Sequence, residues 1–163
     1  MLDVRKSPEL QAVILLLKTA ATPARREMRA GARRALNELW KPTVEQFATT
    51  NQQRQVIARG ARANVGSDSF TMLSATSRRP LSGGLNPTAN WQGAEFGASP
   101  KVVRVSWRGK RRNQTIGKNF GPRAKSGRVA YRAARETAPR IVAAWVNGIV
   151  RGLAQGNRNL ETD

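Results

Sequence analysis

The strongest constraint in this chain is the stretch 96–135, which holds twelve Lys or Arg residues and no Asp or Glu. Like charges at this density repel one another unless a counter-charge lies nearby. Segments with strand-like and helix-like patterns flank the stretch, so the sequence predicts a basic loop on a folded body. We therefore expect the loop to meet an anionic partner, either nucleic acid or the acidic face of another protein.

The composition extends this expectation to the whole chain. Its 163 residues have a net charge of +19 and a pI near 11.9, which favours nucleic acid, an acidic protein or an anionic membrane as partner. Cys and His are both missing, which removes disulfides, thiolate metal sites and the commonest general base. The apolar run 13–17 is too short to span a bilayer. We expect a soluble protein that is not exported and has no membrane partner.

Two helix-start signals stand near the beginning of the chain. Ser7-Pro8-Glu9 offers a capping hydroxyl, a proline at the first helical position and an acid in the first turn. Thr22-Pro23 repeats the signal and predicts a long helix, which Pro42 should kink or break because proline lacks an N–H donor. The remaining expected helices lie over 44–48, 52–61 and 128–136, with a kink or restart at Pro139 before an apolar stripe over 141–153.

Short strands are expected between these helices, at 63–65, 70–75 and 102–105. Gly, Pro, Ser and Asn dominate 77–90, which predicts a loop with Gly83-Gly84 as its most mobile point. Together these elements predict an α+β fold. Its N-terminal helices and C-terminal helix should pack on a small, mostly antiparallel sheet that carries a long basic loop. We expect one domain over 1–163, with an N-terminal helix or arm over 1–21, a core over 22–155 and a flexible tail over 156–163.

A search of the sequence for catalytic chemistry returns little. The ten acids are dispersed, and no phosphate-binding, nucleophile or metal-ligand motif is present. We therefore predict no catalytic, cofactor-binding or metal residues and no cofactor. Glu95 precedes the basic stretch and has two interpretations: a carboxylate that caps a loop or pairs with an arginine, or a catalytic acid.

Several other residues also keep two interpretations. Arg26, Arg29 and Arg33 share one helix face, which is either solvated or contacts a subunit or phosphate. The aromatic residues Trp107, Phe120 and Tyr131 either pack in a core or interface or stack on bases. We expect DNA or partner contacts from the basic candidates Arg104, Arg108, Lys110, Arg111, Arg112, Lys118, Arg123, Lys125 and Arg128.

Six short motifs occur in order between Ala24 and Leu153: Ala32-Arg-Arg-Ala-Leu36, Gly83-Gly84, Trp91-Gln-Gly-Ala-Glu-Phe-Gly97, Phe120-Gly-Pro-Arg123, Gly127-Arg-Val-Ala-Tyr-Arg-Ala-Ala134 and Ala138-Pro-Arg-Ile-Val-Ala-Ala-Trp145. Together they resemble the small neck proteins of long-tailed bacteriophages, the tail-completion or head–tail connector proteins, as found in phages of actinobacteria. The turn Glu95-Phe96-Gly97, followed by the basic loop and a terminal helix, is the most specific part of this resemblance.

The resemblance implies a structural virion protein without enzymatic activity, present in the host cytoplasm during assembly and then in the neck. It implies a homo-oligomeric, hexameric ring around the DNA channel, with head-side connector or stopper proteins and a tail terminator or tail-tube protein as neighbours. Genomic DNA in the channel is a further partner, and Glu95, Phe96 and Gly97 form a structural turn. Two other hypotheses stay open: a free-standing, sequence-nonspecific nucleic-acid-binding protein, and an enzyme such as a nuclease.

Overall fold

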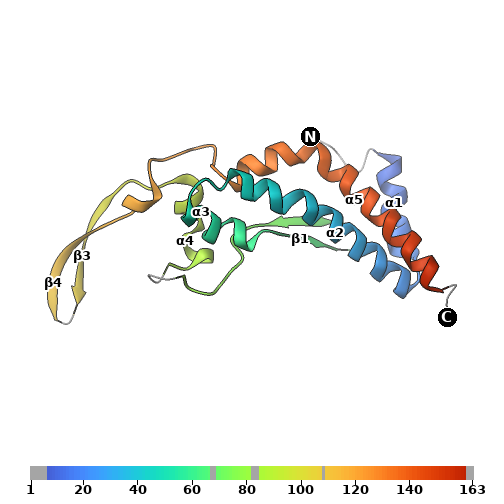
Figure 1. Cartoon of the computed structure of the whole chain (residues 1–163), viewed down its shortest axis with the longest axis horizontal. Coiled ribbons are helices and arrows are strands. Elements are labelled where there is room, and N and C mark those ends of the chain that lie inside the picture. Colours follow the sequence, from blue (N-terminus) through green and yellow to red (C-terminus); the bar gives the residue numbers. More distant parts are fainter. Residues whose placement is uncertain (1–6, 67–68, 82–84, 108, 161–163) are drawn as a thin grey trace. The chain divides into compact units, whose positions relative to one another are not determined.

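The fold is taken from a computed structural model, which describes residues 7–66, 69–81, 85–107 and 109–160. Within these residues the chain forms five α-helices and two separate two-stranded antiparallel sheets (Figure 1), which confirms the α+β class. The expected mobile point Gly83-Gly84 lies outside the described residues.

The chain divides into two compact units, each built from separate stretches of sequence, where we expected one domain. The first unit contains the start of the chain through Thr43, the segment Arg62–Leu73 and the chain from Glu136 onward. The second unit contains Val44–Ala61 and Ser74–Arg135. The division therefore passes through two long helices, α2 (Thr22–Phe47) and α5 (Ala130–Leu160).

Both N-terminal start signals produce helices. Helix α1 spans Pro8–Thr19, and the Ser7 side chain accepts a hydrogen bond from the Leu10 N–H at 3.5 Å. Helix α2 spans Thr22–Phe47 and does not break at Pro42. Next to the proline, the Thr43 hydroxyl donates to the Leu39 carbonyl at 2.8 Å, so this turn gains a side-chain hydrogen bond. The sequence predicted a kink or a break at Pro42, and of these two the break does not occur, since α2 continues to Phe47.

Helix α5 spans Ala130–Leu160 and joins segments that we expected to be separate. Pro139 lies inside this 31-residue helix, as Pro42 does in α2. The helix also runs through 156–160, where we expected a polar tail, while 161–163 lie outside the described residues. The tail expectation is therefore wrong for 156–160, since α5 continues through Gly156 although glycine is a weak helix former.

The core of the first unit lies among α1, α2, α5 and a short sheet. Strand β1 (Arg62–Val65) pairs with β2 (Phe70–Leu73) in antiparallel register, as the sequence predicted. Alternate residues of β1 are buried, which is the period of a strand with one face on a core. The buried cluster comprises Leu10, Leu17, Met28, Ala32, Leu36, Ala63, Val65, Trp145 and Ile149.

Two hydrogen bonds fix the sheet of the first unit to α2. The Trp40 indole N–H donates to the Leu73 carbonyl at 2.8 Å, and the Ala63 N–H donates to the Asn37 side-chain oxygen at 2.9 Å. Both bonds use backbone groups at the ends of the ladder, where a two-stranded sheet leaves groups unpaired. The helix thus satisfies polar groups of the sheet as well as covering its apolar side.

Glycines allow α2 and α5 to approach closely within the first unit. A Cβ built on Gly148 would lie 2.6 Å from the Ala32 Cα and 2.8 Å from the Gly31 carbonyl oxygen. A Cβ on Gly152 would lie 2.4 Å from the Glu27 carbonyl oxygen. These distances are far shorter than carbon–carbon or carbon–oxygen contacts allow, so the two backbones touch where the glycines lie. The sequence analysis did not anticipate this contact.

The second unit contains the short helices α3 and α4, 3₁₀ turns and a hairpin. Helix α3 (Asn51–Val56) begins at a capping box between Thr50 and Gln53, and a 3₁₀ turn follows at Ala58–Gly60. Helix α4 spans Pro87–Phe96, with the Asn86 side chain accepting from the Thr88 N–H at 3.0 Å. We had assigned 77–90 to a loop, and this is wrong for 87–90 because Asn86-Pro87 is a start signal of the same kind as Ser7-Pro8.

We predict that Gly148→Ala lowers the free energy of unfolding by about 1–3 kcal/mol, the usual cost of overpacking. Alanine favours helix formation, so a purely local effect would stabilise the protein instead. Thermal or urea denaturation measures the difference. Val150→Ala is the control, because Val150 is 55% exposed on the same helix and its loss should change stability by no more than about 0.5 kcal/mol. A stabilised Gly148→Ala protein would contradict the close helix contact.

Candidate functional site

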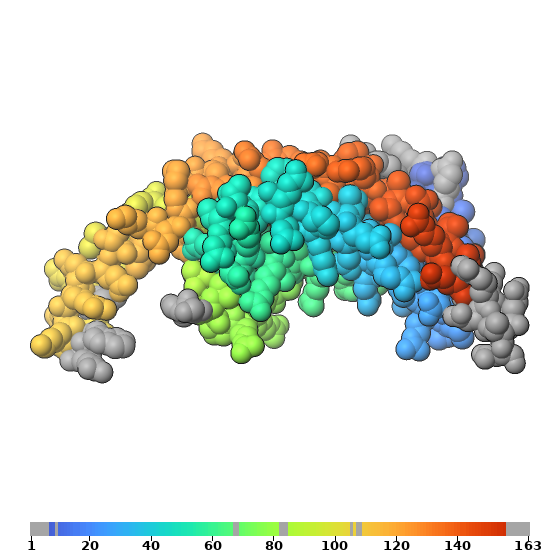
Figure 2. All heavy atoms as spheres, in the orientation of Figure 1, coloured from blue at the N-terminus to red at the C-terminus, as the bar shows by residue number. Residues whose placement is uncertain are grey.

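The centre of the basic stretch is a β-hairpin and not a loop. Strand β3 (Lys101–Trp107) pairs with β4 (Lys110–Ile116), in a register that joins Lys101 to Ile116 and Trp107 to Lys110. All seven residues of β4 are exposed. Figure 1 shows β3 and β4, in yellow and light orange, as a narrow two-stranded ribbon, and the same colours mark their atoms in Figure 2. The expected third strand at 102–105 is confirmed, whereas β4 was not anticipated.

The hairpin carries four of the nine predicted basic candidates in a solvated position. Its described cationic side chains are all exposed: Lys101, Arg104, Lys110, Arg111 and Arg112. None of them has an ion pair or a side-chain hydrogen bond with any residue that the structure describes. Arg108 lies outside the described residues, as does the side chain of Trp107. The ribbon therefore presents positive charge that nothing in the described chain neutralises.

A ribbon of this kind has little to hold it in place. Val102 is 62% exposed and Ile116 is 46% exposed, so these two apolar side chains are not covered. An isolated two-stranded hairpin is only marginally stable in water, and further strands or a packed face are needed for independent stability. The hairpin is thus well suited to become ordered against a partner.

Glu95 anchors the base of this region. The residue is 0% exposed, and its carboxylate accepts from the N–H groups of Arg128 at 3.0 Å, Val129 at 3.2 Å, Ala130 at 3.0 Å and Tyr131 at 3.0 Å. These groups open α5, where the first N–H donors of a helix have no internal partner and the helix dipole favours negative charge. Of the two interpretations of Glu95, the geometry agrees with a cap, here a cap on a helix more than thirty residues away in sequence.

Two glycines make room for this cap. A Cβ on Gly127 would lie 2.5 Å from a Glu95 carboxylate oxygen, and Gly127 has a φ of +73°, which disfavours any side chain. Gly97, with a φ of +72°, ends α4, and its added Cβ would lie 2.0 Å from the Pro122 carbonyl oxygen. Glu95 therefore holds the end of α4 against the start of α5. Gly97 lets the same end lie against the segment that contains Pro122.

Backbone hydrogen bonds and rings complete this junction. The Ala124 N–H donates to the Phe96 carbonyl at 2.7 Å, and the Phe96 ring lies 5.2 Å from that of Tyr131. The Phe120 ring lies against Gly93, where an added Cβ would come within 2.9 Å of it. Phe120 and Tyr131 therefore take part in packing within this unit, although Tyr131 keeps 51% of its surface exposed.

The structure separates Arg128 from the other basic candidates. Its guanidinium donates to the Phe120 carbonyl at 2.8 Å and to the Pro122 carbonyl, so it braces the turn before α5. We had grouped Arg128 with the partner-facing residues, and these two bonds make it a structural residue instead. Arg135 has a similar role, since it donates to the Ser126 carbonyl at 2.7 Å. Sequence reasoning missed both roles because bonds to backbone carbonyls leave no mark in the residue type.

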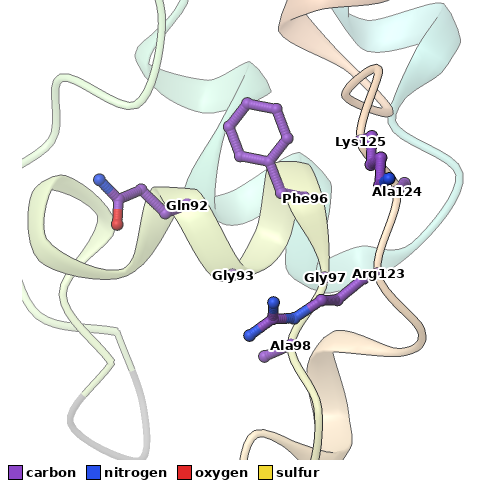
Figure 3. A pocket seen from close by; sticks show the side chains of 8 residues that line it. All are labelled: Gln92, Gly93, Phe96, Gly97, Ala98, Arg123, Ala124 and Lys125. Carbon is purple, nitrogen blue, oxygen red and sulfur yellow. The ribbon is translucent and has the colours of Figure 1, made fainter.

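The remaining candidates are exposed, and two of them line a shallow hollow. Lys118 is exposed in the 3₁₀ turn Lys118–Phe120. Arg123 and Lys125 line a hollow of about 610 Å³ together with α4 residues such as Gln92 and Phe96. Figure 3 shows the Arg123 side chain lying beside Ala98 at the end of α4, with Lys125 on the neighbouring segment. The hollow therefore offers positive charge and hydrogen-bond donors next to the junction.

Neither a metal-binding group of acids nor a membrane-spanning helix is found among the described residues. No group of three or more Asp or Glu residues is placed to hold a metal ion within the part of the chain that the structure describes. Among the same residues, no helix combines the length and the apolar character that crossing a membrane requires.

Comparison with protein-family models, with curated proteins and with solved structures finds no match for this chain.

We predict that Glu95→Gln lowers the free energy of unfolding by about 2–3 kcal/mol. The amide removes the charge and turns an NH₂ group toward N–H donors, which leaves buried donors without an acceptor. Chemical denaturation measures the loss. Glu45→Gln is the matched control, because Glu45 is exposed and its change should stay within about 0.5 kcal/mol. Equal stability of the two variants would contradict the role of Glu95 as a buried helix cap.

Proposed function

We propose that this chain is a structural subunit of the neck of a long-tailed bacteriophage, which joins the head-side connector to the tail. In this proposal it assembles as a hexameric ring around the DNA channel and does not catalyse a reaction. The basic hairpin is the part that meets an anionic partner, either DNA in the channel or an acidic surface of a neighbouring neck protein.

One observation carries the proposal: the hairpin exposes every residue of β4 and pairs none of its cations within the described chain. Such a ribbon adds little to the stability of a folded unit, because its charges repel and its apolar residues Val102 and Ile116 are exposed to water. An anionic partner reverses both effects. A structural protein that works only when assembled accounts for this arrangement better than a protein that acts alone.

The resemblance to neck proteins supplies the setting, and the structure supports it in one respect. Its most specific motif, Glu95-Phe96-Gly97, coincides with a junction that joins α4, the segment 121–124 and the start of α5. The motif thus has a physical reason to occur as a unit. It positions the base of the hairpin, which begins only a few residues later at Lys101.

The second candidate is a free-standing nucleic-acid-binding protein. It is favoured by the shape of the hairpin, because a two-stranded β-ribbon fits the major groove of B-DNA. The two candidates differ in where the protein acts. A purified monomer that binds DNA tightly at about 0.15 M salt, where surface charges are largely screened beyond about 8 Å, would favour the second candidate.

The neck proposal is tested on tailed particles assembled with this gene. Mass spectrometry of purified mature particles should detect the chain, and imaging should place its density as a ring at the head–tail junction. Particles made without the gene should accumulate as separate heads and tails. Absence of the chain from mature, infectious particles would overturn the proposal.

We predict that Lys110→Gln, Arg111→Gln and Arg112→Gln together leave the subunit folded and weaken partner binding. All three side chains are exposed and unpaired, so thermal stability should change little. If the partner is duplex DNA and each cation contacts one phosphate, the log–log dependence of affinity on salt should become shallower by about 2.7. A triple variant that melts the subunit would show that the hairpin is part of the core.

The matched control for this experiment removes the same charge elsewhere. Lys41, Arg62 and Arg151 are exposed and lie outside the hairpin, and their replacement by Gln also lowers the net charge by three. An equal loss of binding in the control would show that only total charge matters and that the hairpin has no special role.

A further inference from the structure

The first unit has a basic surface of its own, which the proposed function does not use. It lies on the N-terminal half of α2, where Arg25, Arg29 and Arg33 are spaced four residues apart and Arg26 lies on the adjacent row. Residues four apart lie on the same side of a helix, and each step advances about 6 Å along the axis. The row from Arg25 to Arg33 is therefore about 12 Å long.

These arginines enclose a hollow and not a flat face. The hollow has a volume of about 460 Å³, and its lining consists of Thr22, Arg25, Arg26, Arg29, Ala30 and Arg33. The small side chain of Ala30 leaves space between the long arginines, and the Thr22 hydroxyl adds a further donor. No acid is part of the lining.

Two of the arginines have buried donors without an acceptor. The Nε atoms of Arg25 and Arg29 are buried and find no hydrogen-bond partner among the described residues. The Arg25 guanidinium is held in place by its Nη2 nitrogen, which donates to the Lys18 carbonyl at 2.8 Å and the Ala20 carbonyl at 2.9 Å. A buried donor without an acceptor is costly. An anion in the hollow would supply acceptors that the protein does not.

The neighbouring charged residues do not neutralise the hollow. Arg34, the next residue after Arg33, donates to the Gln155 side-chain oxygen at 2.6 Å and is not part of the lining of the hollow. Glu27 is the nearest acid in sequence, but it forms no ion pair with a described residue and does not line the hollow. Arg26, Arg29 and Arg33 thus have free guanidinium groups, within the described part of the chain.

We propose that this arginine groove, defined by Arg25, Arg26, Arg29 and Arg33, binds the phosphate groups of a nucleic-acid strand. Guanidinium groups bind phosphate oxygens through paired, charge-assisted hydrogen bonds. A ligand that reaches all four arginines must carry negative charge at several points along about 12 Å. A nucleic-acid strand does so with one phosphate per nucleotide, spaced by about 3.4 Å along a duplex axis. A single inorganic phosphate is too short.

The groove is a second site, separate from the hairpin, and it does not rest on the neck assignment. The hairpin belongs to the second unit and the arginine groove to the first, so each can be altered without changing the other. A nucleic-acid strand could use either surface or both. A change confined to the groove arginines therefore measures the contribution of the groove to binding separately from that of the hairpin.

The test compares full-length variants for binding to a fluorescently labelled single-stranded DNA oligonucleotide at a series of salt concentrations. Arg26→Gln, Arg29→Gln and Arg33→Gln together should make the log–log salt slope shallower by about 2, which is three contacts at about 0.7 each. The control variant Lys41→Gln, Arg62→Gln and Arg151→Gln has the same net charge and should keep the original slope. An unchanged slope in the groove variant would overturn the proposal.

A second variant guards against misfolding of the first. Arg26 and Arg33 are exposed, whereas Arg29 is half-buried, so Arg26→Gln with Arg33→Gln leaves the packing of Arg29 untouched. It should make the slope shallower by about 1.4 at unchanged thermal stability. An unchanged slope in this double variant would also overturn the proposal.

A third arm replaces the oligonucleotide with labelled poly-glutamate. If the groove variant loses poly-glutamate binding while oligonucleotide binding is unaffected, the groove serves an acidic protein and the phosphate proposal fails. Loss of oligonucleotide binding in the groove variant, with the hairpin variant Lys110→Gln, Arg111→Gln and Arg112→Gln also weakened, would support two separate phosphate contacts.

Discussion

The second unit depends on one buried negative charge. The Glu95 carboxylate takes four backbone N–H groups at the start of α5 and is itself withdrawn from water. A buried carboxylate is tolerated only when its oxygens are fully used, and here the helix supplies both hydrogen bonds and a favourable dipole. In a chain with a net charge of +19, the natural partner for a carboxylate would be an arginine side chain. The backbone takes that place instead.

This choice has a consequence for the cations. Because Glu95 is satisfied by N–H groups, it neutralises none of the Lys or Arg side chains around it. The nearby Arg128 is likewise directed at backbone carbonyls and not at an acid. The hairpin cations therefore have no acidic side-chain partner among the described residues. The same pattern holds on α2, where the lining of the arginine groove contains no carboxylate. Each unit thus contains positive charge that the described chain leaves uncompensated.

Much of the fold could be predicted from local rules. Ser7-Pro8 and Thr22-Pro23 mark the starts of α1 and α2, and the strands around 66–69 follow from their patterns. Helix α4 could have been found by the same rule at Asn86-Pro87, but the surrounding Gly, Pro and Ser content hid it. Strand β4 could not be found this way. A strand exposed along its whole length needs no alternation of apolar and polar residues, and alternation is the signal that sequence reading uses.

The less predictable features are contacts between distant residues. The approach of α2 to α5 at Gly148 and Gly152 leaves no local trace, since glycine in a helix reads only as a weak helix former. The role of Glu95 depends on residues more than thirty positions away. Arg128 and Arg111 are both arginines of the basic stretch, and the sequence does not distinguish their roles. The structure shows that Arg128 donates to a backbone carbonyl, whereas Arg111 is exposed.

The open edges of the hairpin finally limit how copies of this chain can meet. An unpaired strand edge usually invites another strand to extend the sheet, and lysine or arginine side chains along the edge are a common defence against it. Two such ribbons placed edge to edge would bring Lys110, Arg111 and Arg112 of each copy together. Charge repulsion between these side chains therefore opposes pairing of two copies of the ribbon along this edge.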